Sequence, residues 1–209
     1  MKVAVSFLKS KFDNKETIDK INETDSDFLH VDVMDGNFVE RKNFSFNEFK
    51  EWSKDNKKLL DVHLMVENPI NYIFDYKKLK PEYITIHSEI DKNLDDLIDL
   101  IHSYNIKAGI SIKPKTSIEG IEHILSKIDN VLIMSVDPGK GGQKFNPSVL
   151  YKIDVLRKLR EENNYNYIIS IDGGINNKTI DKVKDVDLVI SGSYICESKD
   201  YQANINKLR

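Results

Sequence analysis

The chain of 209 residues has one cysteine and no long hydrophobic run. Cys196 has no second cysteine to pair with, which excludes an internal disulfide and is typical of proteins in a reducing compartment. No stretch approaches the roughly 20 apolar residues that cross a bilayer. The apolar start is interrupted at Lys9, which favours a buried first strand over a signal peptide. We therefore expect a cytoplasmic protein that does not engage a membrane.

An excess of charge of one sign is also missing. The sequence has 31 lysines and arginines against 34 aspartates and glutamates, a formal net charge of -3. Such a balance creates no field suited to a polyanion, so we expect no nucleic-acid partner. A chain of this length can bury a substantial core as one domain, and no linker or low-complexity tract divides it. We predict a single domain over residues 1–209.

Short apolar, β-branched runs recur along the chain and alternate with stretches of helical periodicity. The runs lie near residues 3–6, 28–34, 59–65, 83–87, 106–112, 130–136, 167–172 and 187–191. Helical spacing of leucine and isoleucine is clear over 93–104 and 147–160. Runs that are apolar at nearly every position are typical of parallel strands covered on both faces. The alternation predicts an α/β fold, a closed (β/α)₈ TIM barrel, with an open doubly wound sheet as the alternative.

Polar side chains stand at or near the ends of four of these runs: His30 and Asp32, His63, His87, and Asp172. His30 and Asp32 share a strand face because successive side chains alternate. In such barrels, the carboxyl ends of the strands form the active site. Taken singly, a strand histidine is more often a packed core residue, and an aspartate after a strand is commonly a helix cap. Together, two imidazoles and two carboxylates predict a divalent metal site where a carboxylate can also move a proton.

Glycines gather after the sixth, seventh and eighth runs, in the segments 139–142, 173–174 and 192–193. Glycine lets the backbone approach a ligand closely, and barrels often bind phosphate with the loops after strands seven and eight. A single Gly-Gly pair is more often only a tight turn. Three such segments in succession favour a phosphorylated small molecule as ligand. Lys140 and Lys144 would strengthen the anion field there.

These motifs resemble the ribulose-phosphate 3-epimerase family. The resemblance rests on Val5-Ser6, His30 to Val39, Asp61 to Val66, Ile86 to Glu89, Met134 to Gly139, Gly141 to Phe145, Ile171 to Gly174 and Ser191 to Ser193. Their order and spacing match over nearly the whole chain. The resemblance implies a ribulose-phosphate-binding barrel, an isomerase of the pentose phosphate pathway and a homo-oligomer. It also implies one divalent metal per subunit, either Zn, Fe, Mn or Co.

Residue roles follow from the same resemblance. It implies that His30, Asp32, His63 and Asp172 bind the metal. Asp32 and Asp172 would also be the acid–base pair, one on each face of the substrate, with His87 as a supporting residue. The implied substrate-binding residues are Ser6, His63, Met34, Met65, Met134, Gly139, Gly141, Gly142, Gly173, Gly174, Gly192 and Ser193. For the methionines, packing of the barrel interior is an equally good explanation.

Two loops depart from the family pattern. Residues 40–44 read Glu-Arg-Lys-Asn-Phe where family members commonly have Pro-Asn and a small hydrophobic segment, and Lys140 replaces an apolar residue. Both departures bear on the choice of sugar. Our leading hypothesis is a metal-dependent 3-epimerase that interconverts D-ribulose 5-phosphate and D-xylulose 5-phosphate through an enediolate.

Three alternatives remain open. The chain is an epimerase of another ketose phosphate such as D-allulose 6-phosphate, a sugar-phosphate-binding barrel without catalysis, or a barrel that decarboxylates or cleaves its substrate with a catalytic lysine. Lys113 is the candidate for that lysine, but this reaction would leave the histidine and aspartate set without a role.

Overall fold

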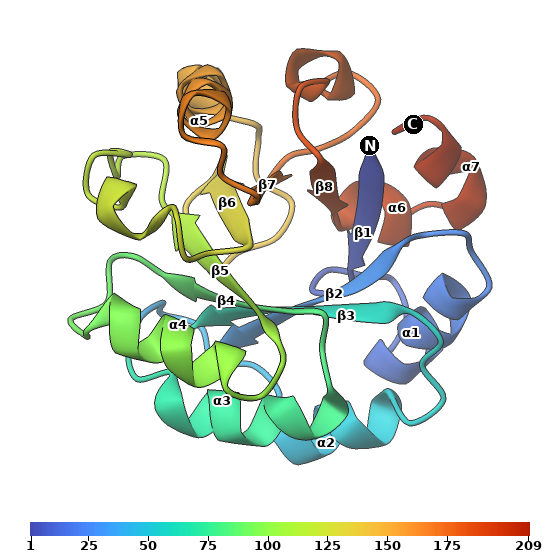
Figure 1. Ribbon diagram of the computed structural model, residues 1–209. Helices are drawn as coiled ribbons and strands as arrows, with labels where there is room; N and C mark the ends of the chain where they lie inside the picture. Colours follow the sequence, from blue (N-terminus) through green and yellow to red (C-terminus); the bar gives the residue numbers. More distant parts are fainter.

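The computed structural model describes residues 1–209 and contains eight parallel strands closed into a barrel (Figure 1). The strands are β1 (Lys2–Ser6), β2 (Phe28–Met34), β3 (Leu59–Met65), β4 (Tyr83–His87), β5 (Lys107–Ile112), β6 (Asn130–Met134), β7 (Ile168–Asp172) and β8 (Leu188–Ser191). Each strand pairs with the next in the sequence, and β8 pairs with β1. The predicted TIM barrel is confirmed, and the open sheet is wrong.

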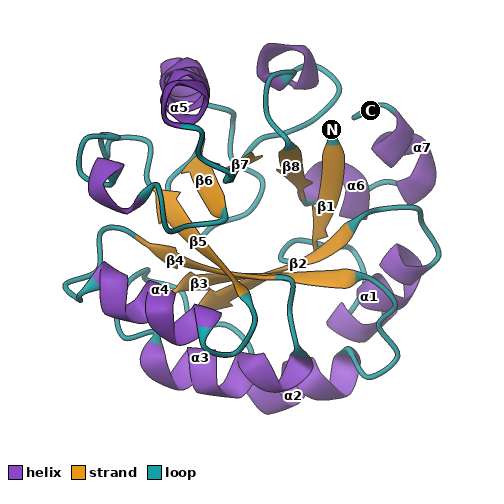
Figure 2. Ribbon diagram, viewed as in Figure 1, coloured by secondary structure: helices purple, strands orange, loops and turns teal.

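Helices surround the barrel (Figure 2). They are α1 (Asn14–Asn22), α2 (Phe46–Trp52), α3 (Ile70–Tyr76), α4 (Leu94–His102), α5 (Leu150–Asn163), α6 (Ser193–Cys196) and α7 (Tyr201–Asn206), with 3₁₀ turns η1 (Lys77–Leu79), η2 (Glu122–Ile124), η3 (Pro147–Val149) and η4 (Ile180–Val183). The connections from β5 to β6 and from β7 to β8 contain only η2 and η4, so a full helix does not follow every strand. None of the helices is both long enough and apolar enough to span a bilayer.

Strand alternation separates an apolar outer layer from a partly polar interior. In β2, Leu29, Val31 and Val33 belong to the large hydrophobic cluster that also contains helix residues. His30 and Asp32, which point the opposite way, face the barrel interior, and all seven β2 residues are buried. Alternate residues of β2 thus contribute to the hydrophobic core and to the candidate site. Two successive strands, β2 and β3, place their interior polar residues side by side, with Asp32 opposite His63.

Gly109 in β5 lies opposite Thr85 of β4 in the barrel interior. A Cβ atom at this position would collide with Oγ1 of Thr85, and the strand backbones leave little room to move. We expect Gly109→Ala to lower the free energy of unfolding by about 1–3 kcal/mol, the usual cost of overpacking. Urea unfolding would measure the change. Gly120→Ala is the matched control, because a Cβ added there would lie 3.8 Å from its nearest atom, the carbonyl oxygen of Ser117. Equal free energies of unfolding for the two variants would contradict a close-packed interior.

Candidate active site

A cavity of about 380 Å³ opens at the carboxyl ends of the strands. Its walls are the loops after β6, β7 and β8, together with side chains from the strand ends. The predicted site residues that line it are Ser6, Asp32, Met65, Met134, Gly139, Gly141, Gly142, Asp172, Gly173, Gly174, Gly192 and Ser193. His30, Met34 and His63 do not line it. Met34 is buried against Met65 and Val39, and the side chain of His63 is fully buried.

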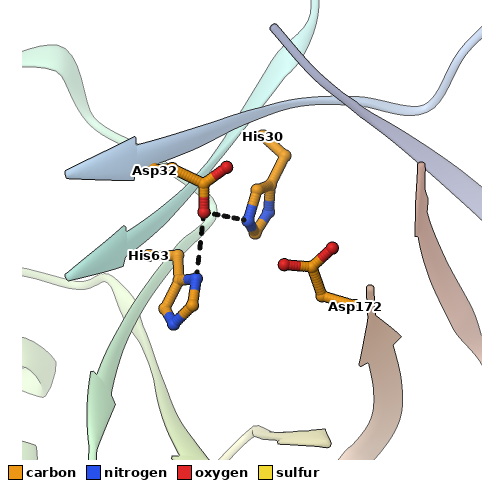
Figure 3. Close-up of side chains that lie close together, drawn as sticks. All are labelled: His30, Asp32, His63 and Asp172. Carbon is orange, nitrogen blue, oxygen red and sulfur yellow. Dashed lines mark hydrogen bonds and ion pairs between the residues drawn. The ribbon is translucent and has the colours of Figure 1, made fainter. Parts of the chain in front are cut away.

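The four predicted metal ligands come together (Figure 3), and two of them, Asp32 and Asp172, line the cavity. β2 supplies His30 and Asp32, β3 supplies His63, and Asp172 reaches in from β7 (Figure 3). One ligand atom from each residue can be chosen so that all lie within 4.8 Å of one another. Residues separated by more than 100 positions in the sequence therefore form one cluster.

His30 is held from behind by a second carboxylate. Its Nδ1 lies 2.7 Å from Oδ2 of Asp61, which is buried one layer deeper in β3. Its other ring nitrogen, Nε2, is buried, has no hydrogen-bond partner and lies 3.4 Å from Oδ1 of Asp32. A histidine whose Nδ1–H donates to a carboxylate turns the Nε2 lone pair toward the cluster, which is the usual arrangement of a metal-binding histidine.

Contacts to the side chain and to the backbone hold Asp32 in place. Its Oδ2 accepts a hydrogen bond of 2.7 Å from the Ser6 hydroxyl, and its Oδ1 lies 3.2 Å from Nδ1 of His63. The Asn43 side chain donates to the Asp32 carbonyl at 2.6 Å and accepts from the Met34 amide at 3.0 Å. Asn43 belongs to the departing loop, which therefore folds back on β2 and supports the site.

The model of the ribulose-phosphate 3-epimerase family matches residues 2–196. The chain belongs to this family. It is 39% identical over 212 aligned residues to the ribulose-phosphate 3-epimerase of Helicobacter pylori strain J99, a match that covers 100% of this chain and 97% of the relative. The Bacillus subtilis enzyme of the same name is 35% identical, with 100% of this chain and 98% of the relative covered. The protein is accordingly an enzyme of the isomerase class, an epimerase.

Solved structures show the same fold at low sequence identity. The 3-hexulose-6-phosphate synthase of Salmonella typhimurium superposes with a TM-score of 0.71 at 17% identity and covers 100% of this chain and 96% of its own. The tryptophan synthase alpha subunit of Campylobacter jejuni gives a TM-score of 0.69, also at 17% identity, with 100% and 95% covered. At this identity the likeness concerns the barrel alone.

The environment of the candidate site displaces the pKa values of Asp32 and Asp172 in opposite directions. Burial, together with the nearby charge of Asp32, raises the pKa of Asp172 to about 6. Burial alone would raise the pKa of Asp32 too, but the charge and hydrogen bond of His30 hold it well below its ordinary value. Two carboxylates with separated pKa values are suited to opposite roles, one as acid and one as base.

The donor set fits a divalent cation. Burial alone would lower the pKa of His30, but the charges of Asp32 and Asp61 raise it well above its ordinary value. A positive charge is thus favoured at the point that Nε2 faces, and a proton or a metal ion can supply it. Two imidazoles with two carboxylates match Zn²⁺, Fe²⁺, Mn²⁺ or Co²⁺ better than Mg²⁺, which prefers oxygen ligands.

The glycine loops require glycine at defined points. Gly142, Gly173 and Gly174 have φ angles of +75°, +112° and +64°, in the range that L side chains rarely adopt. A Cβ at Gly174 would also collide with the backbone nitrogen of Phe145. The Ser135 hydroxyl donates to the Gly173 carbonyl and fixes the turn after β7. These loops present backbone to the cavity without side chains in between.

Lys9 and Glu197 are among the charged residues of the cavity wall that the sequence reasoning missed. Lys9 follows β1, Glu197 follows α6, and their side chains form an ion pair of 3.2 Å. The Lys9 ammonium lies against Gly142, 2.7 Å from where a Cβ would stand. Neither residue carries a motif signal. The proximity of Lys9 to the first predicted strand end was the only clue in the sequence.

The departing loop residues and Lys113 occupy the rim of the site. The Glu40 carboxylate lies 3.6 Å from the Lys140 ammonium, and both side chains are largely exposed. Lys140 lines the cavity, but Glu40 does not. The Lys113 ammonium lies 4.0 Å from the centre of the Phe38 ring and is not part of the cavity wall. Lys113, the candidate catalytic lysine for a decarboxylation or cleavage reaction, is therefore not placed to act in this cavity.

Proposed function

We propose that this epimerase interconverts D-ribulose 5-phosphate and D-xylulose 5-phosphate, and that Asp32 and Asp172 carry the proton. The observation that supports this most directly is the pair of carboxylates that reach one cavity from β2 and β7 with pKa values displaced in opposite directions. The relatives named ribulose-phosphate 3-epimerase support the choice of substrate.

The reaction requires a base and an acid on opposite faces of C3. C3 lies beside the C2 carbonyl, so removing its proton leaves an enediolate. In one direction, ionised Asp32 takes the C3 proton from one face while protonated Asp172 gives a proton to the other face. C3 is inverted, one proton has entered and one has left, and the substrate keeps its composition. In the reverse reaction, the two carboxyl groups exchange roles.

The four clustered side chains would hold one divalent cation, whose positive charge stabilises the negative charge that develops on the oxygens of the enediolate. Asp61 orients His30 for this task, and Ser6 orients Asp32. Met65 and Met134 add apolar surface to the cavity wall, where they help to exclude water from the planar intermediate.

The phosphate would lie against the glycine loops after β6, β7 and β8, where the Lys9 ammonium lies against Gly142. We expect Lys9→Met to raise KM for the sugar phosphate about 10-fold, corresponding to about 1.4 kcal/mol, with kcat little changed. The physical reason is that the ammonium attracts the phosphate equally in the ground state and the transition state. Steady-state kinetics would measure both constants. Lys11→Met, at an exposed neighbouring position, is the control; an unchanged KM in Lys9→Met would remove Lys9 from the phosphate site.

A panel of ketopentose and ketohexose phosphates, assayed with Zn²⁺, Fe²⁺, Mn²⁺ and Co²⁺, tests the proposed substrate. We expect kcat/KM for D-ribulose 5-phosphate to exceed that for D-allulose 6-phosphate by at least about 10-fold, since a pocket fitted to one chain length discriminates by this amount. The reverse order would make the enzyme a hexulose-phosphate epimerase. Tight binding without turnover under every metal would favour a binding protein.

We also expect a homo-oligomer, which light scattering in solution would test.

A further inference from the structure

A hydrogen-bonded chain runs from the proposed metal site to the neighbouring strands β4 and β5. His63 Nε2 lies 2.9 Å from Nε2 of His87, and His87 Nδ1 lies 2.9 Å from Oε2 of Glu89. Both imidazoles are fully buried. The rings of His63 and His87 stack with their centres 4.9 Å apart, and the Phe38 ring covers His87 at 4.6 Å.

Burial alone would raise the pKa of Glu89, but hydrogen bonds from His87, the Lys113 amide and the Thr116 hydroxyl lower it to about 2, so the carboxylate is ionised and accepts hydrogen bonds. Its Oε1 accepts from the Lys113 backbone amide at 2.7 Å and from the Thr116 hydroxyl at 2.5 Å. The buried Lys152 ammonium holds the same turn, because it donates to the carbonyls of Lys113 and Thr116 at 2.8 Å and 2.7 Å. Since a backbone amide cannot change from donor to acceptor, the turn fixes the orientation of the Glu89 carboxylate.

The direction of every proton in the chain follows from this anchor. The acceptor Glu89 requires a proton on Nδ1 of His87. Only one proton fits between two nitrogens 2.9 Å apart. A proton on Nε2 of His87 as well as on Nδ1 would make this buried ring positively charged, which is costly. His87 therefore accepts at Nε2, and His63 donates from Nε2. The Nδ1 lone pair of His63 is then left to face Oδ1 of Asp32 at 3.2 Å, where two acceptors need a cation between them.

We propose that Glu89 is a positioning residue that sets the tautomer of His63 through His87, and so turns a lone pair rather than a proton toward the proposed metal. This inference rests on the proposed metal site. Asp61 orients His30 directly, whereas Glu89 acts on His63 through one intervening imidazole.

Glu89→Gln is the sharpest variant because it is nearly isosteric and inverts the chain. The Lys113 amide would bind the glutamine oxygen and leave the glutamine NH₂ facing Nδ1 of His87. His87 must then accept at Nδ1 and donate from Nε2, so His63 accepts at Nε2 and carries its proton on Nδ1, where the metal would bind. We expect a 10- to 100-fold loss of Zn²⁺ affinity, the usual effect of removing such a partner.

Nitrogen-15 NMR of the histidine rings reads the tautomers directly, independently of catalysis. In the Zn²⁺-loaded wild-type protein we expect protons on Nε2 of His63 and Nδ1 of His87. In Glu89→Gln we expect the His87 proton on Nε2. Asp129→Asn is the matched control, since Asp129 lies 2.8 Å from His102, a half-exposed histidine outside the cavity, and should leave Zn²⁺ affinity unchanged.

The results separate this inference from the proposed function. A wild-type protein with Nε2 of His63 unprotonated overturns the inference, and so does Glu89→Gln with wild-type tautomers or wild-type affinity. If Glu89→Gln does not fold, the wild-type spectrum still decides. If the tautomers are as expected but D-ribulose 5-phosphate is not epimerised, the positioning role of Glu89 stands and the proposed function fails.

Discussion

Asp172→Asn and Asp32→Asn are each expected to lower the rate of epimerisation by at least about 10³-fold, within the range that general acid–base catalysis contributes. An amide at either position can neither take the C3 proton nor return one. Because epimerisation needs both faces of C3, losing either carboxylate stops it. Steady-state rates on D-ribulose 5-phosphate and D-xylulose 5-phosphate, measured with excess divalent metal, would give the size of the loss.

The two variants should differ in which sugar they still deprotonate. With one carboxylate left, the enzyme can remove the C3 proton from one epimer only and return a solvent proton to the same face. Each variant should therefore exchange C3 hydrogen with one sugar, and the two variants should choose opposite sugars. Asp154→Asn, on the exposed face of α5, is the control and should behave as wild type. Rapid epimerisation by either site variant would remove that carboxylate from its role.

Removal of divalent metal should produce the second large effect, a loss of activity of at least about 10²-fold, because stabilisation of a developing oxyanion is commonly worth that much. Without a cation, the orphaned Nε2 of His30 and the nearby Asp32 carboxylate favour a proton in its place. A proton brings one positive charge where a divalent cation would bring two, so it would offset less of the negative charge of the enediolate. Activity after exhaustive chelation, followed by titration with single metals, measures the effect.

Reconstitution distinguishes a catalytic cation from a structural one. We expect Zn²⁺, Fe²⁺, Mn²⁺ or Co²⁺ to restore the rate and Mg²⁺ to restore it poorly, as the two imidazole ligands imply. Circular dichroism of the chelated protein should show the folded barrel, since the hydrophobic cluster does not depend on the site. Full activity in metal-free protein would contradict the proposed cation site.

The sequence carried the barrel and the ligand cluster because both depend on strand periodicity. Alternation along β2 assigns Val31 and Val33 to the hydrophobic core outside the barrel and Asp32 to the barrel interior. A local pattern thus predicts which side chains from distant parts of the sequence lie close together. The four ligands were recognisable because each belongs to such a strand, and the structure brings them together as expected. Their chemical roles remain proposals.

The features that could not be predicted depend on loop conformation and on distances between loops. The Lys9–Glu197 pair joins the two ends of the chain, and no local pattern links those residues. The contact of Asn43 with the β2 backbone requires the exact path of the loop after β2. Glu89 gains its importance only when the turn containing Lys113 approaches it from β5. His87 was expected to be a supporting residue, but its partners were visible only in three dimensions.

Incubation with substrate in deuterated water tests the central claim most directly. If the enzyme moves a proton at C3 through two carboxylates, each turnover of D-ribulose 5-phosphate or D-xylulose 5-phosphate should place solvent deuterium at C3 of the product, detectable by NMR. Product that forms at the full rate with no deuterium at C3 would contradict proton abstraction at that carbon, and with it the roles proposed for Asp32 and Asp172.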